Sequence, residues 1–142
     1  IHMVRDGIDV VESYVRAGLV HGHEEAAARW VSSVEAARLV QRRYRAQFLE
    51  VRYESLVREP ERAVRRVCEF LEVEFEPTML TATNHIQRMG DVDRYEHHAQ
   101  TRLPIQTESI GKGWRTLDPQ VLGTLSSVMG PHLQELGYDV PA

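Results

Sequence analysis

The chain is poor in cysteine, in aromatic residues and in positive charge. Cys68 is the only cysteine among the 142 residues, so no disulfide can form within the chain. Aromatic residues make up 7% of the sequence, and acidic residues outnumber lysine and arginine by 21 to 17. The formal net charge of −4 argues against a nucleic-acid-binding protein, because such domains are usually basic. Any anion-binding site must therefore be a local cluster of cations.

Long apolar runs are missing as well. No stretch approaches the roughly 20 apolar residues that cross a bilayer, so the sequence predicts a soluble chain without a membrane span. Cys68 lies in Val67-Cys-Glu-Phe-Leu71, a setting typical of a buried structural thiol rather than of a nucleophile. The low cysteine content is compatible with a reducing compartment, and we expect a cytoplasmic location. The seven histidines match no standard zinc-ligand spacing, so no metal site is expected.

Hydrophobic residues (42%) and charged residues (27%) occur in the proportions of ordinary globular domains. Periodicity and helix signals predict an α/β chain with few strands and mostly helices. The expected strands are Ile1–Val4 and Phe48–Tyr53. The expected helices are Gly7–Gly18, about Glu24–Ala46, one that begins at Pro60, Thr78–Ala82 and one that begins at Pro119.

Four of these helices show an apolar face, which in Gly7–Gly18 is formed by Val10, Val11, Tyr14 and Val15. In the long second helix the expected apolar stripe is Trp30, Val34, Ala37, Val40 and Tyr44. The arginines off this stripe are expected to be solvated, namely Arg38, Arg42, Arg43 and Arg45. The helix at Pro60 should bury Val64, Val67, Phe70 and Leu71. The last helix should bury Val121 or Leu122, Leu125, Val128 or Met129, and Leu133.

Residues Asn84–Glu108 show weak periodicity and mixed charge. Such long excursions are typically functional loops, so we expect this one to be mobile without ligand and to line a cleft. Its histidines (His85, His97 and His98) are interpreted as solvated or cleft-lining side chains.

Arg5 and Ser13 are the first candidates for a binding site. Arg5 falls at the carboxyl end of the first expected strand, where ligands collect in open α/β sheets. Ser13 lies eight residues later, about two helical turns on. A guanidinium and a hydroxyl placed in this way can converge on one phosphate. The alternative is an ion pair between Arg5 and Asp6 at the surface, with Ser13 facing solvent.

Two further segments carry candidate binding residues. Gly111-Lys112-Gly113 offers backbone amides and a cation that can wrap a phosphate, although it could equally be a surface turn before Trp114. Trp114 is expected to be a packing anchor, and Arg115 either a second phosphate donor or a surface charge. Tyr53, at the end of the second expected strand, presents a flat ring suited to a nucleotide pocket or to the core.

Several segments together resemble the sulfotransferases that use 3′-phosphoadenosine 5′-phosphosulfate. Val4-Arg-Asp-Gly7 followed by Ser13-Tyr14 resembles their 3′-phosphate-binding segment. The Arg-Asp-Gly variant of this segment, with Trp30 downstream, resembles the protein-tyrosine branch and its bacterial relatives. Four further segments resemble later parts of the family in the same order, namely Phe48–Glu61, Val67–Leu71, Ser109–Arg115 and Met129–Tyr138.

The resemblance implies a function for each candidate. Arg5 and Ser13 would bind the 3′-phosphate of the co-substrate, Tyr53 would contact the adenine, and Gly111-Lys112-Gly113 would close over the 3′ side. The reaction would transfer a sulfuryl group to a hydroxyl or amine of a small molecule, sugar or peptide and release adenosine 3′,5′-bisphosphate. The fold implied is a P-loop-type sulfotransferase fold with a parallel sheet.

The family also has an earlier strand, a loop that cradles the 5′-phosphosulfate and a helix, and nothing in this sequence resembles them. We therefore expect residues 1–142 to be the carboxyl-terminal portion of one sulfotransferase domain, to partner the missing amino-terminal half, and to be inactive alone. The family's proton acceptor falls in that other half, so no catalytic residue is assigned. The alternatives are a non-catalytic helical interaction module and another P-loop-type nucleotide-dependent transferase.

Overall fold

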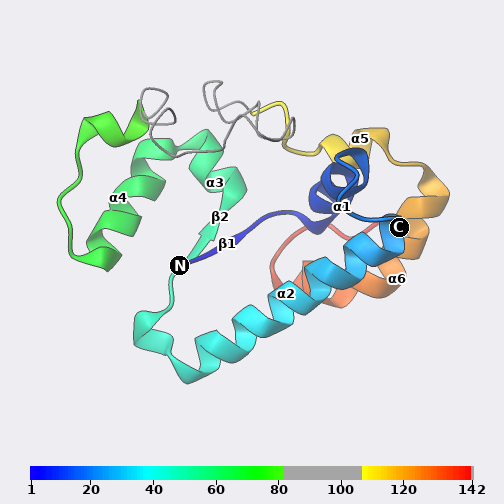
Figure 1. Ribbon diagram of the computed structural model, residues 1–142, viewed down its shortest axis with the longest axis horizontal. Helices are drawn as coiled ribbons and strands as arrows, with labels where there is room; N and C mark the ends of the chain where they lie inside the picture. Colours follow the sequence, from blue (N-terminus) through cyan, green and yellow to red (C-terminus); the bar gives the residue numbers. More distant parts are fainter. Residues whose placement is uncertain (82–106, 142) are drawn as a thin grey trace. The chain divides into compact units, whose positions relative to one another are not determined.

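The computed structural model describes residues 1–81 and 107–141. The expected excursion Asn84–Glu108, with its histidines, lies outside the described residues except at its last two positions. The chain divides into two compact units, the first formed by Ile1–Glu50 with Glu108–Ala142 and the second by Val51–Thr107. The first unit thus combines the two ends of the sequence (Figure 1).

The first unit is a small helical assembly around one core. Its elements are β1 (His2–Val4), α1 (Gly7–Arg16), α2 (His23–Arg43), a 3₁₀ turn (Arg45–Gln47), α5 (Lys112–Thr116) and α6 (Pro119–Glu135). Helix α1 packs against α2, α5 and α6, and α6 also packs against α2. The core is formed mainly by Val4, Ile8, Val11, Ala26, Ala27, Trp30, Val34, Leu125, Met129 and Leu133.

Helix α1 has a defined start and stop. The Asp6 side chain caps it by accepting hydrogen bonds from the Ile8 and Asp9 backbone amides, and Arg16 lies in the last turn, where a cation is favourable. Gly18 follows the helix with a φ of 66°, a conformation that glycine adopts at little cost. The helix thus ends at Arg16, two residues before the predicted Gly18, which forms the turn that follows it.

The buried apolar stripe of α2 is shorter than the sequence predicts. Trp30, Val34 and Ala37 are buried, whereas Val40 and Tyr44 are about half exposed. The reason is the position at which α6 ends. Its last residue is Glu135, whose carboxylate lies 3.1 Å from Arg38 Nε. The cover that α6 provides thus ends near Arg38. The expectation that Arg38 is solvated is wrong for the same reason, while Arg42, Arg43 and Arg45 are exposed as predicted.

Helix α6 follows its prediction closely. Asp118 accepts a hydrogen bond from the Gln120 amide at 2.8 Å, and Pro119 takes the first helical position. Leu125, Met129 and Leu133 are buried, whereas Val128 is 44% exposed, so Met129 is the inward residue of that pair. Gly137, with a φ of 70°, ends the helix, and the Tyr138 amide donates back to the Leu133 carbonyl.

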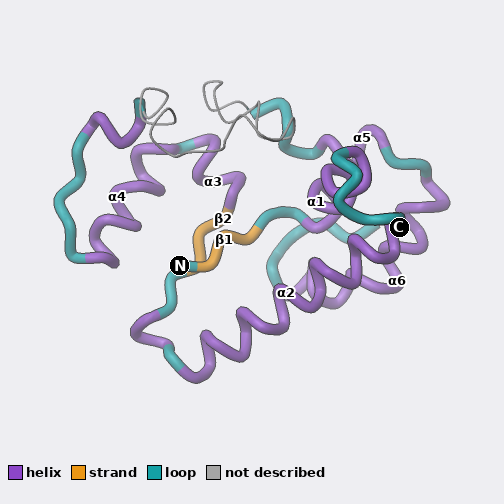
Figure 2. Tube along the Cα trace, in the orientation of Figure 1, coloured by secondary structure: helices purple, strands orange, loops and turns teal. Residues whose placement is uncertain are grey.

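The strands are short. β2 comprises Glu50–Arg52 and pairs with β1 in a two-stranded sheet, in which the His2 amide donates to the Leu49 carbonyl at 2.8 Å. The predicted strand Phe48–Tyr53 is thus too long, and Tyr53 begins a helix instead of ending the strand. Helices dominate and the strands are few, so the predicted α/β class is confirmed (Figure 2).

The second unit contains α3 (Tyr53–Arg58), α4 (Pro60–Leu71) and a 3₁₀ turn (Pro77–Leu80). Pro60 occupies the first position of α4, as predicted. Cys68 is buried, with its Sγ 3.7 Å from the Sδ of Met79, so the prediction of a structural thiol is confirmed. Leu71 was predicted to be buried but is 52% exposed, because α4 ends there and the chain turns at Glu72 with a φ of 56°.

Within residues 1–81 and 107–141, no helix combines the length and the apolar character that crossing a bilayer requires. The same described residues bring together no group of three or more metal-ligating side chains.

Candidate functional site

Three of the predicted site residues, Arg5, Gly111 and Gly113, come together around one carboxylate. Asp9, in the first turn of α1, is 1% exposed. Its Oδ2 accepts a hydrogen bond from the Gly111 amide and its Oδ1 one from the Gly113 amide, both at 2.8 Å. Arg5 Nη2 lies 3.6 Å from Asp9 Oδ2. The start of α1 is thereby joined to a segment about 100 residues further along the chain.

Arg5 is held from three sides. Its Nη2 donates a hydrogen bond to the Ser109 carbonyl at 2.6 Å, in addition to its ion pair with Asp9. Its own carbonyl accepts a hydrogen bond from the indole Nε1 of Trp30 at 3.1 Å. The Arg5 side chain is 21% exposed, so it is held by these contacts and still reaches solvent at the carboxyl end of β1.

Asp6 and Trp114 join the same two segments. Asp6 Oδ2 accepts a hydrogen bond from Trp114 Nε1 at 3.1 Å, while its Oδ1 caps α1. Burial raises the pKa of the Asp6 carboxyl above its ordinary value of 3.8, and the hydrogen bonds from Trp114 and Ile8 only partly offset this. Trp114 also packs against the core, so its predicted role as a packing anchor is confirmed.

The glycine segment has a defined backbone conformation and packs closely against α1. Gly111 has a φ of 69°, and Lys112 begins the short helix α5. A Cβ at Gly113 would lie 2.4 Å from the Ile8 carbonyl oxygen, so only glycine fits there without displacement. Two of the amides that were expected to wrap a phosphate donate to Asp9 instead.

Lys112 contacts α1 at Glu12, the residue before Ser13 in the sequence. Lys112 Nζ is 3.4 Å from Glu12 Oε1, which also accepts a hydrogen bond from Arg16 Nε at 3.0 Å. Ser13, the next residue on α1, is half-buried, and its hydroxyl has no hydrogen-bond partner among the residues described. Two cations, Arg16 and Lys112, therefore pair with the Glu12 carboxylate.

A small cavity adjoins Arg5. Its volume is about 130 Å³, and Arg5, Tyr14, Arg29 and Ser33 are among the residues that line it. The negatively charged chain thus has a local concentration of arginine next to a polar cavity, as an anion site in such a chain requires.

Two other candidates lie elsewhere or act differently. Tyr53 belongs to the second unit, where it is half-buried as the first residue of α3, and its role beside adenine stays a prediction. Arg115 is exposed, and it donates to the carbonyls of Ile110 and Glu108 at 3.0 and 2.9 Å. These hydrogen bonds hold the backbone just before the glycine segment. This role was not among those predicted for Arg115.

Asp9 is the site residue that the sequence interpretation missed. A carboxylate between Ile8 and Val11, both of which are buried, interrupts the apolar face of α1. That interruption was a usable signal, because a charged residue on a buried face needs partners. What the sequence could not indicate is that these partners are backbone amides of residues 111 and 113.

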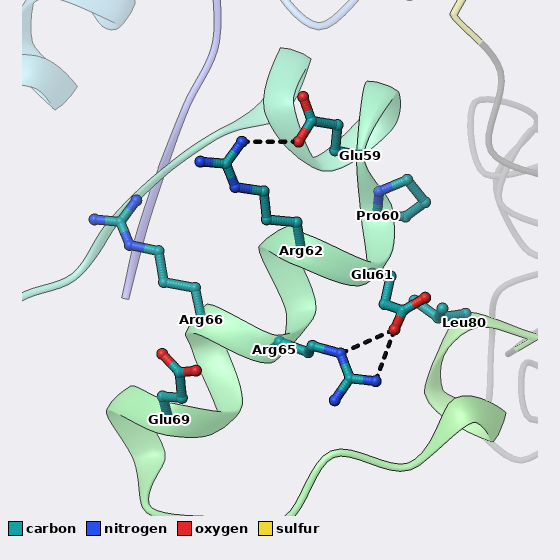
Figure 3. A pocket seen from close by; sticks show the side chains of 8 residues that line it. All are labelled: Glu59, Pro60, Glu61, Arg62, Arg65, Arg66, Glu69 and Leu80. Carbon is teal, nitrogen blue, oxygen red and sulfur yellow. Dashed lines mark hydrogen bonds and ion pairs between the residues drawn. The ribbon is translucent and has the colours of Figure 1, made fainter.

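A second concave surface lies along α4, between charged side chains (Figure 3). Two of its three arginines pair with carboxylates at the start of the same helix, Arg62 with Glu59 at 3.0 Å and Arg65 with Glu61 at 2.7 Å. None of the predicted site residues lines it. It is a surface of solvated ion pairs, which contribute little individually.

Comparison with known proteins decides the family. A model described as the sulfotransferase family matches residues 1–77, more than half of the chain. This chain belongs to the sulfotransferase family. The resemblance read from its motifs is thereby confirmed at the level of the family.

Individual sulfotransferases match over much of this chain. A Caenorhabditis briggsae protein named for the protein-tyrosine sulfotransferases is 26% identical over 98% of this chain and 52% of its own length. Protein-tyrosine sulfotransferase A of Caenorhabditis elegans is 32% identical over 64% of this chain and 24% of its own length. This sulfotransferase chain therefore spans about half the length of the first of these relatives.

Solved structures share the fold. The sulfotransferase domain of the Synechococcus PCC 7002 olefin synthase has a TM-score of 0.71 and 23% identity, covering 97% of this chain and 48% of that domain. The sulfotransferase domain from the curacin biosynthetic pathway has a TM-score of 0.74 and 24% identity, covering 98% and 53%. This sulfotransferase chain thus has the fold of about half of each domain.

Proposed function

We propose that this chain carries the 3′-phosphoadenosine-binding side of a sulfotransferase that uses 3′-phosphoadenosine 5′-phosphosulfate. The observation that carries the proposal is the fixed guanidinium of Arg5, held by Ser109 and Asp9 at the carboxyl end of β1. Arginine presents a planar set of donors that matches phosphate, and its side chain here still reaches solvent. Membership of the sulfotransferase family supports a sulfated nucleotide as the donor.

The other candidates complete the proposed nucleotide site. Ser13 would add a neutral donor to the 3′-phosphate, and Lys112 a second cation near it. The Gly111–Gly113 segment would set the position of Lys112 at that site, since its amides are fixed by Asp9. Tyr53 would contact the adenine ring.

In the proposed reaction, the acceptor oxygen or nitrogen bonds to sulfur as the bridging S–O bond of the phosphosulfate breaks. The electron pair of that bond stays on the 5′-phosphate, and the product is adenosine 3′,5′-bisphosphate. The acceptor proton goes to a base that we do not assign to this chain. The role of this chain is to anchor the 3′ end of the donor and so to fix the direction of transfer, which lowers the barrier by orientation.

We further propose that residues 1–142 form the carboxyl-terminal portion of one sulfotransferase domain. In that arrangement the 5′-phosphosulfate loop and the base come from sequence that this chain does not contain. The acceptor would be a hydroxyl or amine of a small molecule, a sugar or a peptide.

Replacing Arg5 tests the nucleotide site. We expect Arg5→Ala in the intact protein to weaken binding of adenosine 3′,5′-bisphosphate by about 1.5–3 kcal/mol, the contribution of a hydrogen bond to a charged group. Titration calorimetry on wild type and variant measures this directly. Arg62→Ala is the control, because its side chain is 84% exposed on α4.

Equal affinities of wild type and Arg5→Ala would remove Arg5 from the site. A wild type that does not bind the bisphosphate at all would favour the helical interaction module instead.

A further inference from the structure

Asp9 is a buried carboxylate whose partners lie on a distant segment. It is 1% exposed, and a carboxylate is rarely buried to this degree unless it is paired. Its two oxygens accept from Gly111 and Gly113, and Arg5 lies beside Oδ2. The charge of Asp9 is thus neutralised by the same residues that we place at the proposed 3′-phosphate site.

The start of α1 does not require this arrangement. Asp6 already caps the helix through the amides of Ile8 and Asp9. A residue that served only the helix end would face those amides or solvent. Asp9 instead faces the backbone of α5's first turn, on the side where a Cβ at Gly113 would meet α1.

Arg5 depends on the same contacts. Its Nη2 is placed by the Asp9 carboxylate and by the Ser109 carbonyl, two residues before Gly111. Asp9 fixes the segment that carries this carbonyl, so it orients the guanidinium both directly and through Ser109. A small displacement of such a group is enough to weaken a directional phosphate contact.

We infer that Asp9 is the positioning residue of the proposed 3′-phosphate site, holding the Arg5 guanidinium and the Gly111–Gly113 segment in one geometry. It acts through these groups without touching the nucleotide. The inference rests on the proposed function, because it assigns Asp9 a role toward the nucleotide that Arg5 binds.

Asp9→Asn in the intact protein tests the inference. Asparagine has the same shape and keeps one acceptor oxygen, but its NH₂ group cannot accept from a backbone N–H, so one of the two glycine contacts is lost. We expect the affinity for adenosine 3′,5′-bisphosphate to fall at least tenfold. The affinity for adenosine 5′-monophosphate, which lacks the 3′-phosphate, should change less than twofold. Asp118→Asn is the matched control, because asparagine caps a helix as well as aspartate does.

A double variant tests whether Asp9 acts through Arg5. In the Arg5→Ala background, Asp9→Asn should weaken bisphosphate binding by no more than about threefold, because the guanidinium that it positions is already absent. An undiminished tenfold effect in that background would overturn the inference.

The nucleotide comparison separates the remaining outcomes. Equal losses of affinity for both nucleotides in Asp9→Asn would leave the preference for the bisphosphate unchanged. This outcome would show a merely structural role and overturn the inference. A wild type with no preference for the bisphosphate over the monophosphate would instead overturn the proposed function.

The wild type alone provides a second measurement if Asp9→Asn does not fold. In an NMR titration, the amide signals of Gly111 and Gly113 should shift more with the bisphosphate than with the monophosphate. Identical shifts with the two nucleotides would overturn the inference without any variant.

Discussion

At the scale of single residues, Asp6 both starts a helix and carries a charge that burial disfavours. Its carboxylate accepts from Ile8, Asp9 and Trp114. Burial nevertheless raises its pKa above 3.8. The folded state therefore takes up this proton at a higher pH than the unfolded state does. The contribution of Asp6 to stability is complete below 3.8 and is lost as the pH rises through the raised pKa.

Asp6→Asn should expose this dependence. The variant keeps an acceptor for the helix cap but has no proton to bind. We expect the free energy of unfolding of the wild type, minus that of Asp6→Asn, to increase as the pH is lowered from 7 to 4. Urea denaturation at several pH values measures it, with Asp118→Asn as the control for loss of one carboxylate. A difference that is flat or falls with acidification would contradict the pKa direction.

Gly113 and Gly123 should respond oppositely to the same substitution. Gly113→Ala places a Cβ 2.4 Å from the Ile8 carbonyl oxygen, and we expect it to destabilise the fold by about 1–3 kcal/mol through overpacking. Gly123→Ala, inside α6 with nothing within 4 Å, should stabilise it by about 0.5–1 kcal/mol. Urea denaturation compares them, and effects of the same sign would refute the close approach of α5 to α1.

At the scale of the secondary-structure elements, Arg38 joins three segments of the first unit. Its Nη1 lies 3.1 Å from Glu50 Oε2 at the start of β2, and its Nε lies 3.1 Å from Glu135 Oε1 at the end of α6. The Arg38 side chain is only 16% exposed, so solvent screens these pairs less than it screens the ion pairs along α4.

Arg38→Met should therefore destabilise the protein by about 1–3 kcal/mol, since it leaves Glu50 and Glu135 without this cation. Arg38→Lys should recover only part of the loss, because one ammonium cannot reproduce the two directions of a guanidinium. The matched control is Arg42→Met on the exposed face of the same helix. Thermal unfolding would contradict this prediction if the two methionine variants had the same midpoint.

The elements that the sequence predicted well are those with local signals. Asp118-Pro119 and Gly137 bound α6, and Gly18 follows α1, because capping is decided by neighbours in sequence. The error at Arg38 concerns a contact at long range. Arg38 was expected to be solvated, and its neighbour Glu135 at the end of α6 lies about 100 residues away in sequence.

In the candidate site, too, local features could be predicted from the sequence and long-range contacts could not. Arg5 could be proposed from the sequence because its place at a strand end and its charge are local properties. The partnership of Asp9 with Gly111 and Gly113 could not, because about 100 residues separate the donors from the acceptor. The five-residue helix α5 was missed because so short a helix has little periodicity of its own.

At the scale of the whole molecule, the chain spans 52% of the length of its Caenorhabditis briggsae relative. We expect residues 1–142 alone to transfer no sulfate, because anchoring the 3′ end leaves the sulfur of the donor unoriented. An assay with radiolabelled 3′-phosphoadenosine 5′-phosphosulfate and a panel of phenol, sugar and tyrosine-peptide acceptors measures this. Acceptor-dependent turnover above the buffer rate would show that the catalytic groups lie within these residues.

The first unit is assembled from both ends of the chain, and this has a consequence for its synthesis on the ribosome. Residues 1–50 are made about 80 residues before Leu133 and Leu136, the last residues of their core. At roughly 5–20 residues per second this interval lasts about 4–16 s. During this interval, the apolar side of α1 and the Asp9 carboxylate lack the partners that α5 and α6 later provide. The second unit is complete in sequence before then, so we expect the first unit to complete its folding after the second.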